Sequence, residues 1–279
     1  MLYLRYLVLI VVVCLHLAGV LFVMYLHQSR PASTSFSVLS VGQGDAVLIK
    51  TASGQNILID TGPDAQVLSA LDEMMTLSER SIDLIFLTHP HADHIGGFLD
   101  VIRRYQVGGV VMSNVRYSSV VYEQMLRVIQ QEHLRLWWAE ASVDWQLSKD
   151  MSLDILYPFS LFEQERQFKN VNNASVVMML KTPHWRCLLT GDMEAPLEQI
   201  LGDYYGVRLQ ADCLKAAHHG SKTSSFPGFL GLVRPSEIFI SVGRRNRFHH
   251  PAEVTVNNLQ HWGVVKRTDE VGTITKKLL

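Results

Sequence analysis

Four residues of the types that bind metal ions stand close together early in the chain. His89, His91, Asp93 and His94 directly follow the mostly apolar run 82–87. Imidazole nitrogens and carboxylate oxygens are donors that zinc, manganese and iron accept in proteins. His89 and His91 alternate along an extended segment and can chelate one ion, while Asp93 and His94 can face a neighbouring ion. The chemistry that such a cluster predicts is hydrolysis by metal-activated water.

Two later segments contain residues that can complete this metal site. Asp192 follows the apolar run 187–190, and its two carboxylate oxygens can bridge two cations held ~3.5–4 Å apart. His218 and His219 follow a strand-like run and precede Gly220, which permits a sharp turn. Either histidine can bind metal or act as a general acid, and the sequence leaves this choice open. We include His219 among the ligands, and Asp93, His218 and His219 among the catalytic candidates.

Charged and polar residues near these segments are candidates to orient the ligands or to contact a substrate. Glycines before Asp45 permit a tight backbone, and Asp45 and Asp60 can accept hydrogen bonds from ligating histidines. Lysine and arginine side chains after two of the strands can neutralise an anionic substrate such as a phosphate. The supporting candidates are Asp45, Asp60, Asn173, Lys215, Ser221, Arg244 and His250.

Composition and hydropathy define the organisation of the 279-residue chain. A net charge of −1 argues against a general nucleic-acid coat protein, and three cysteines do not form a disulfide framework. Residues 6–26 are almost wholly apolar, and about twenty helical residues span the hydrocarbon core of a membrane. We therefore predict a single-pass anchor over residues 1–27, with a cleaved signal as the alternative. A linker over 28–35 and one hydrolase domain over 36–279 follow, and we favour an extracytoplasmic position for this domain.

The remaining chain alternates strand-like and helix-like patterns. The Gly54-Gln55 turn predicts a hairpin, and helices are predicted near 97–105, 122–132, 196–201 and 252–262. A last hairpin is predicted from strands at 264–268 and 272–278. The order of elements repeats: a group of strands is followed by strands that alternate with helices, and the same order then occurs a second time. This order predicts an α/β fold in which two sheets lie between helices, an αββα sandwich.

With these residues in place, the chain resembles the metallo-β-lactamase superfamily, and in particular the hydrolase domain of ComEC-type competence proteins. The resemblance covers roughly residues 36–279. It implies an αββα sandwich, a dinuclear site holding two divalent ions such as zinc or manganese, and hydrolysis of a phosphodiester or nucleic acid. The segments that carry it are 41–46, 59–62, 88–97, 172–175, 190–192, 214–221 and 250–251.

Two departures from the family pattern bear on function. Many superfamily hydrolases have a further histidine between the first cluster and the bridging aspartate, and Asn172-Asn173 stands at this place here. Asparagine is a weaker, neutral ligand, so the resemblance implies that one metal is loosely held, with Asn173 near the site. The multi-helix channel of full-length competence proteins is also missing. A role in DNA uptake would therefore require a channel-forming partner.

Two other functions are compatible with the sequence. The chain could hydrolyse another ester or a lactam-type amide, or it could be a nucleic-acid-binding scaffold with little turnover, because asparagine replaces a histidine ligand. The aromatic residues Trp137, Trp138, Trp145, Tyr204 and Tyr205 could stack against bases, although packing in the core or at an interface is the simpler interpretation.

Overall fold

The computed structural model describes residues 3, 11–19, 34–76, 78–141, 143–160 and 169–278. The chain divides into two compact units, Met1–Ala32 and Ser33–Leu279, and every described strand lies in the second. The predicted anchor and linker fall largely outside the described residues. Within the anchor, the described residues 11–19 are helical. Over the described part of the chain, no helix combines the length and the apolar character needed to cross a membrane.

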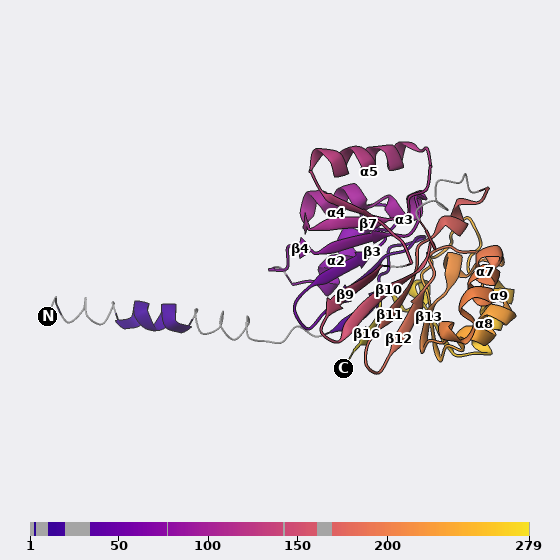
Figure 1. Ribbon diagram of the computed structural model, residues 1–279. Coiled ribbons are helices and arrows are strands. Elements are labelled where there is room, and N and C mark those ends of the chain that lie inside the picture. Colours follow the sequence, from indigo (N-terminus) through magenta and orange to yellow (C-terminus); the bar gives the residue numbers. More distant parts are fainter. Residues whose placement is uncertain are drawn as a thin grey trace. The chain divides into compact units, whose positions relative to one another are not determined.

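The second unit contains two seven-stranded sheets that pack face to face (Figure 1). The first sheet has the order β16 (Ile274–Lys277), β1 (Ser35–Val38), β2 (Val47–Lys50), β3 (Asn56–Ile59), β5 (Leu84–Leu87), β7 (Gly109–Met112) and β8 (Arg135–Trp138). The second has the order β15 (Val264–Arg267), β14 (Glu237–Ile240), β13 (Cys213–Lys215), β12 (Arg186–Leu189), β11 (Val177–Lys181), β10 (Met151–Tyr157) and β9 (Asp144–Ser148). Strands β4 (Ser81–Ile82) and β6 (Gln106–Val107) form a separate pair.

Helices cover the outer face of each sheet (Figure 1). The first sheet is covered by α2 (Gln66–Met74), α4 (Phe98–Arg104) and α5 (Val120–Gln131), and the second by α7 (Ala195–Tyr205), α8 (Pro227–Val233) and α9 (Glu253–Gln260). Shorter elements are α3 (Ala92–Ile95), α10 (Thr268–Val271) and the 3-10 turns η1 (Val171–Ala174), η2 (Gly206–Leu209) and η3 (Ala217–Gly220). The predicted αββα sandwich is confirmed.

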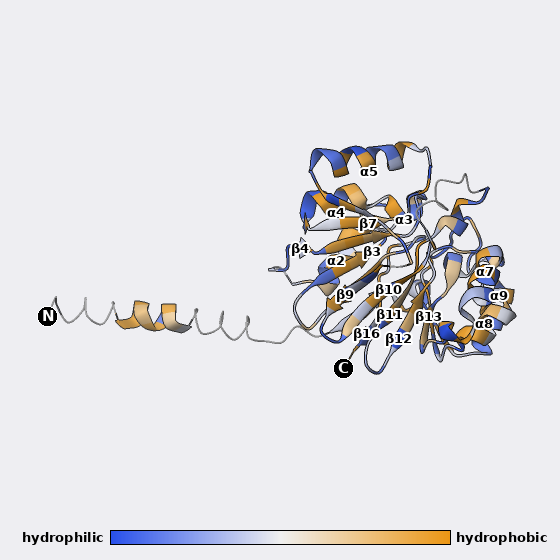
Figure 2. Ribbon diagram, viewed as in Figure 1, coloured by the Kyte–Doolittle hydropathy of each residue, from blue (hydrophilic) through white to orange (hydrophobic). Residues whose placement is uncertain are grey.

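The strands are apolar on both faces because each sheet is buried on both sides. Alternate residues of a strand point to opposite faces. In β2, Val47 and Ile49 pack between the sheets, whereas Leu48 packs beneath the helices. In β13, Cys213 joins the core between the sheets and Leu214 the core beneath α7 and α8. Figure 2 shows the result, with hydrophobic residues concentrated in the strands and hydrophilic ones on the outer helices.

Parallel pairing brings the ends of several strands to one edge of each sheet. Strands β3, β5, β7 and β8 are parallel to one another, as are β12, β13, β14 and β15. In such sheets the loops after the strands meet at a common edge, where ligands are usually bound. The candidate metal ligands leave β5, β12 and β13 in these loops.

The predicted C-terminal hairpin is wrong. Strand β15 pairs in parallel with β14 in the second sheet, whereas β16 pairs antiparallel with β1 in the first. Helix α10 connects them, so the chain crosses from one sheet to the other at this point. A turn signal at Gly272 reports a change of direction but not the strand with which the next segment pairs.

The aromatic candidates for base stacking separate into two groups. Trp137 and Trp145 pack against the core between the sheets, where the Trp145 ring lies 5.5 Å from that of Phe86. Tyr204 is 59% exposed and lies under the guanidinium of Arg208. The tryptophan pair therefore stabilises the fold, as the simpler interpretation predicts.

Candidate metal centre

The first sheet presents its metal candidates on the loop after β5 and on the short helix α3. His89 and His94 are buried, while Asp93 and His91 lie at the rim. The backbone around Gly44 packs directly against α3, because a Cβ added at Gly44 would lie 2.2 Å from the Asp93 carbonyl oxygen. Only glycine allows this approach, which explains the glycine-rich sequence before Asp45.

The second sheet presents Asp192 after β12 and two histidines after β13. The backbone N–H of Asp192 donates to Ser175 Oγ at 3.0 Å, which fixes the carboxylate at the mouth between the sheets. His218 and His219 both adopt left-handed backbone angles, with φ of 50° and 53°. Two successive left-handed residues turn the chain sharply, so the imidazoles leave the strand end in different directions.

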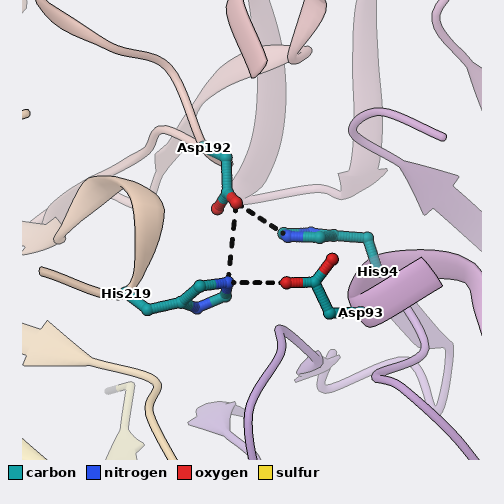
Figure 3. A group of neighbouring side chains, drawn as sticks. All are labelled: Asp93, His94, Asp192 and His219. Atoms are coloured by element: carbon teal, nitrogen blue, oxygen red, sulfur yellow. Dashed lines mark hydrogen bonds and ion pairs between the residues drawn. The ribbon is translucent and has the colours of Figure 1, made fainter. Parts of the chain in front are cut away.

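Four of these side chains meet in one cluster, shown in Figure 3. Asp192 Oδ2 lies 3.2 Å from His94 Nε2 and 3.5 Å from His219 Nε2, and His219 Nε2 lies 3.3 Å from Asp93 Oδ2. The potential ligand atoms of Asp93, His94, Asp192 and His219 all lie within 4.8 Å of one another. Two residues come from each sheet, which is the convergence that the sequence predicts.

A second set of donors adjoins this cluster and shares Asp192 with it. His89 Nε2 lies 3.9 Å from Asp192 Oδ2 and 3.1 Å from His91 Nδ1. Asp192 therefore stands between the His89–His91 pair and the cluster containing His94 and His219. This is the position that a bridging carboxylate requires.

Buried carboxylates orient the histidines from behind. Asp60 Oδ2 lies 2.7 Å from His94 Nδ1, and Asp45 Oδ1 lies 3.2 Å from His219 Nδ1. The hydrogen bond of His219 Nδ1 goes to the Ser241 carbonyl oxygen at 3.0 Å, with the Asp45 carboxylate beside it. With the proton held on Nδ1 in this way, the lone pair of the ring is left on Nε2, the atom that faces the cluster.

The neighbouring carboxylates and histidines shift the pKa values of the buried histidines. Burial alone lowers the pKa of a histidine, but Asp192 and Asp60 raise the pKa of His94 well above its ordinary value. Asp192 and Asp45 likewise outweigh burial and raise the pKa of His219 to about 10. Burial and the neighbouring His94 instead lower the pKa of His89 well below its ordinary value.

The donor set fits divalent metal ions. His94 Nε2 and Asp192 Oδ1 are buried and make no hydrogen bond in the described structure, and His94 Nε2 lies in ion-pair contact with the other oxygen, Asp192 Oδ2. Burial opposes ionisation of Asp192, yet His219 and His94 hold its pKa well below the ordinary range, so the carboxylate is charged. Metal binding would displace the protons of His94 and His219 and satisfy these atoms.

His218 differs from His219 in its surroundings. Its side chain is 21% exposed, and its Nδ1 lies 3.1 Å from Glu194 Oε1. It lines a cavity of about 320 Å³ that also contains His91, Asp93 and Asp192. Both histidines line this cavity, but they differ in position: His219 is buried within the metal cluster, whereas His218 is more exposed, with its Nε2 3.8 Å from Asp192 Oδ2.

The two neighbouring asparagines, Asn172 and Asn173, also differ in their surroundings. Asn172 lines the cavity, whereas the side chain of Asn173 accepts the backbone N–H of Glu194 at 2.9 Å. Asn172 Nδ2 donates to Glu194 at 3.0 Å, and its Oδ1 is buried with no hydrogen-bond partner among the described residues. Asn173 therefore supports Glu194, the partner of His218, while Asn172 on the same turn η1 is the member of the pair that lines the cavity.

The structure defines the surroundings of three further supporting candidates. Lys215 is buried and paired with Asp45, the acid beside His219, which places it behind the ligand cluster and not in contact with the cavity. Ser221 is buried with its Oγ 3.0 Å from Thr223 Oγ1, and Arg244 donates to the Asp269 carbonyl at the surface.

His250 does line the cavity. Its Nδ1 is buried with no hydrogen-bond partner among the described residues. Burial, followed by the nearby His218 and His219, lowers the pKa of His250 to about 4. The ring is therefore neutral at physiological pH, and it closes one wall of the site.

Several residues at the site were not singled out by the sequence. Glu194 lies two positions after Asp192 and holds His218, Gln43 lines the cavity, and the Tyr117 ring lies 5.6 Å from that of His91. Arg247 and Phe248 line the same cavity. The spacing from Asp192 is a usable signal for Glu194, but no local pattern distinguishes Tyr117 from a core aromatic residue.

Comparisons with known proteins agree with this geometry. Residues 39–237 match the model of the metallo-beta-lactamase superfamily. The chain is 27% identical to ComE operon protein 3 of Bacillus subtilis (strain 168) over 91% of its own length, and 29% identical to competence protein ComA of Neisseria gonorrhoeae over 92%. It spans 34% of each of these relatives.

Solved structures share the fold at low sequence identity. The metallo-beta-lactamase fold protein YhfI from Bacillus subtilis has a TM-score of 0.55 and 11% identity, with 87% of this chain and 99% of that chain covered. Tm1679, a metal-dependent hydrolase of the beta-lactamase superfamily, has a TM-score of 0.56 and 14% identity, with 88% and 99% covered. The chain belongs to the metallo-β-lactamase superfamily of metal-dependent hydrolases.

Proposed function

We propose that the chain hydrolyses phosphodiester bonds of nucleic acid with the help of two divalent metal ions, zinc or manganese. The observation that carries this proposal is the cluster of Asp93, His94, Asp192 and His219, beside which His89 and His91 form a second set of donors. We expect Asp192 and Asn172 Oδ1, which has no hydrogen-bond partner among the described residues, to complete the second set. An amide oxygen is a weaker ligand than histidine, so this site should hold its ion less tightly.

Bound divalent ions lower the pKa of water and stabilise negative charge on phosphate oxygens. The protein supplies the remaining steps. Asp60 and Asp45 keep the Nε2 atoms of His94 and His219 directed at the ligand cluster. His218, oriented by Glu194 at Nδ1, can deliver a proton from Nε2 to the leaving oxygen.

A phosphodiester is favoured over other esters by charge and by similarity. The guanidinium of Arg247 lines the cavity beside the ligand cluster, and arginine offers a planar fork of donors to phosphate oxygens. The relatives include competence protein ComA and, at 30% identity over 88% of the chain, recombination protein 2 of Haemophilus influenzae. Competence and recombination are both processes that act on DNA.

The test is a comparison of substrates with the full chain, stripped of metal and then reconstituted with zinc or manganese. We expect cleavage of single-stranded DNA and of a chromogenic phosphodiester, and loss of both in the His91→Ala and Asp192→Asn variants. Arg103→Ala, on the exposed surface of α4, is the control. Turnover of a lactam without phosphodiester cleavage would favour a lactam-type hydrolase. DNA binding without metal uptake or cleavage would favour a scaffold.

The membrane anchor remains part of the proposal. The apolar run at residues 6–26 supports a single-pass anchor that places the hydrolase domain outside the cytoplasm, beside a channel-forming partner. Extraction of cell membranes with alkaline carbonate tests the anchor, because an anchored chain stays in the membrane pellet. Protease accessibility of the hydrolase domain in intact cells tests its side of the membrane.

A further inference from the structure

The cavity at the metal cluster continues into a second hollow. This second cavity has a volume of about 450 Å³, and Pro63, Ala92 and Phe248 give it a largely apolar wall. The residues that line both cavities are Gln43, Ala92, Asp93, Arg247 and Phe248. A substrate held at the metal cluster therefore has an adjoining, mostly apolar space into which a neighbouring group can extend.

Phe248 lines this space with a partly exposed aromatic ring. Its side chain is 49% exposed, and its ring is stacked on His250 with a centroid distance of 5.8 Å and an interplanar angle of 25°. The guanidinium carbon of Arg247 lies 4.8 Å from the centroid of the Phe248 ring. A half-exposed aromatic ring beside a cation is the combination with which proteins hold single-stranded nucleic acid.

The loop that carries Phe248 is held in place by its own hydrogen bonds. Asn246 Oδ1 accepts the backbone N–H groups of Phe248 at 3.1 Å and of His250 at 3.0 Å. Asn246 Nδ2 donates to the carbonyl groups of Gly243 and His250. Gly243 in turn packs against Gln43, because an added Cβ would lie 2.6 Å from the Gln43 nitrogen. The ring is thus positioned before a substrate arrives, which reduces the entropic cost of binding.

We propose that Phe248 stacks against a nucleobase adjacent to the scissile phosphodiester while Arg247 contacts a neighbouring phosphate, so that the enzyme selects single-stranded nucleic acid. This inference rests on the proposed function and specifies its substrate. A base in a duplex is already stacked between its neighbours and is not free to lie on Phe248. An unpaired nucleotide can place its base in the apolar hollow and its phosphate beside the metal ligands.

Binding measured without cleavage tests the proposal. The full chain is treated with a chelator, and its affinity for a fluorescent single-stranded oligonucleotide is measured by anisotropy. We expect Phe248→Ala to weaken binding by about 5- to 150-fold, and Phe248→Trp to restore it. Phe226→Ala is the matched control, because the Phe226 side chain is 45% exposed and lies at the start of α8, outside both cavities.

Oligonucleotides that lack bases separate stacking from a structural role. On an oligonucleotide of abasic sites, Phe248→Ala should have no effect, because there is no base to lose, and annealing a normal strand to its complement should also remove the effect. Arg247→Ala should weaken both normal and abasic strands and lower the slope of log affinity against log salt by about 0.7. Arg103→Ala serves as its control.

Results of two kinds would overturn the stacking site. One is unchanged affinity in Phe248→Ala, and the other is an equal loss on normal and abasic strands. Cleavage by the metal-loaded wild-type chain is measured separately, which distinguishes the two proposals. If the wild type cleaves DNA but Phe248→Ala binds normally, only the stacking site fails. If binding depends on Phe248 but no metal supports cleavage, the proposed hydrolysis fails and the stacking site stands.

Discussion

Replacing Asp60 by asparagine should weaken metal binding without disturbing the fold. Asp60 is buried and has a φ of 57°, a left-handed angle that asparagine also tolerates. Its Oδ1 accepts the Thr88 backbone N–H at 2.8 Å, and its Oδ2 lies 2.7 Å from both Thr88 Oγ1 and His94 Nδ1. Asparagine keeps the first contact but places an NH₂ group where Oδ2 was.

The consequence is a change of tautomer at His94. An NH₂ group cannot accept the proton of His94 Nδ1, so in the neutral ring, the form that binds metal, this nitrogen must accept instead and the one remaining proton lies on Nε2. Nε2 is the atom 3.2 Å from Asp192 Oδ2, and a protonated nitrogen has no lone pair for a metal. Loss of such an orienting partner typically costs about 10- to 100-fold in metal affinity. That factor corresponds to about 1.4–2.7 kcal/mol.

The assay is competition for zinc or manganese between the protein and a chromogenic chelator, with thermal unfolding of the metal-free protein measured in parallel. Asp154→Asn is the matched control, because Asp154 is another buried carboxylate but pairs with Lys181 in the second sheet. Nitrogen chemical shifts of the histidine rings report the tautomer directly. Metal affinity within about threefold of wild type, with the proton of His94 still on Nδ1, would refute the reasoning.

Three further substitutions test how the site is supported. Lys215→Met should lower the free energy of unfolding by about 3–5 kcal/mol in urea titrations, because buried Asp45 loses its partner cation, and a loss below about 1 kcal/mol would contradict this. Gly44→Ala should lower both the melting temperature and the metal affinity, because its Cβ would meet a backbone oxygen of α3. Gly54→Ala is the control, because Gly54 also has a positive φ but an added Cβ would have no atom within 4 Å, and it should change both quantities less. Burial raises the pKa of Glu198 to about 7 from an ordinary 4.5, so the folded state keeps a proton that the unfolded chain has already lost between these values. This contribution to stability is complete below pH 4.5 and is lost as the pH rises through about 7, and Glu198→Gln should flatten the fall in unfolding free energy between about pH 5 and about pH 8.

The sequence predicts the layers and the ligands because both depend on local patterns. An apolar run that ends in histidine or aspartate indicates a buried strand with donors at its end, and this pattern recurs before His89, Asp192 and His218. Parallel pairing then brings those ends together. The orienting acids Asp45 and Asp60 were predictable for the same reason, since each follows a strand-like or glycine-rich segment near the site.

The sequence leaves the role of a side chain open where a distant partner determines its position. The neighbours of Lys215 in sequence do not decide between a substrate contact and a supporting role, because its partner Asp45 lies 170 positions away. Asn172 and Asn173 are equivalent in sequence, and only the phase of the 3-10 turn decides which one faces the cavity. The pairing of β16 with β1 joins the two ends of the hydrolase domain, which no turn signal encodes.

The same contacts that orient the ligands also connect the two sheets. Asp45, from the first sheet, contacts Lys215 and His219 of the second, while His94 of the first sheet contacts Asp192 of the second. These groups are buried, so each would be costly to leave without a partner. The sandwich therefore cannot separate at this edge without exposing the ligand cluster. A metal ion that binds the folded protein and not the unfolded chain adds its free energy of binding to the free energy of unfolding. Fold stability and catalytic competence are for this reason coupled through one set of side chains.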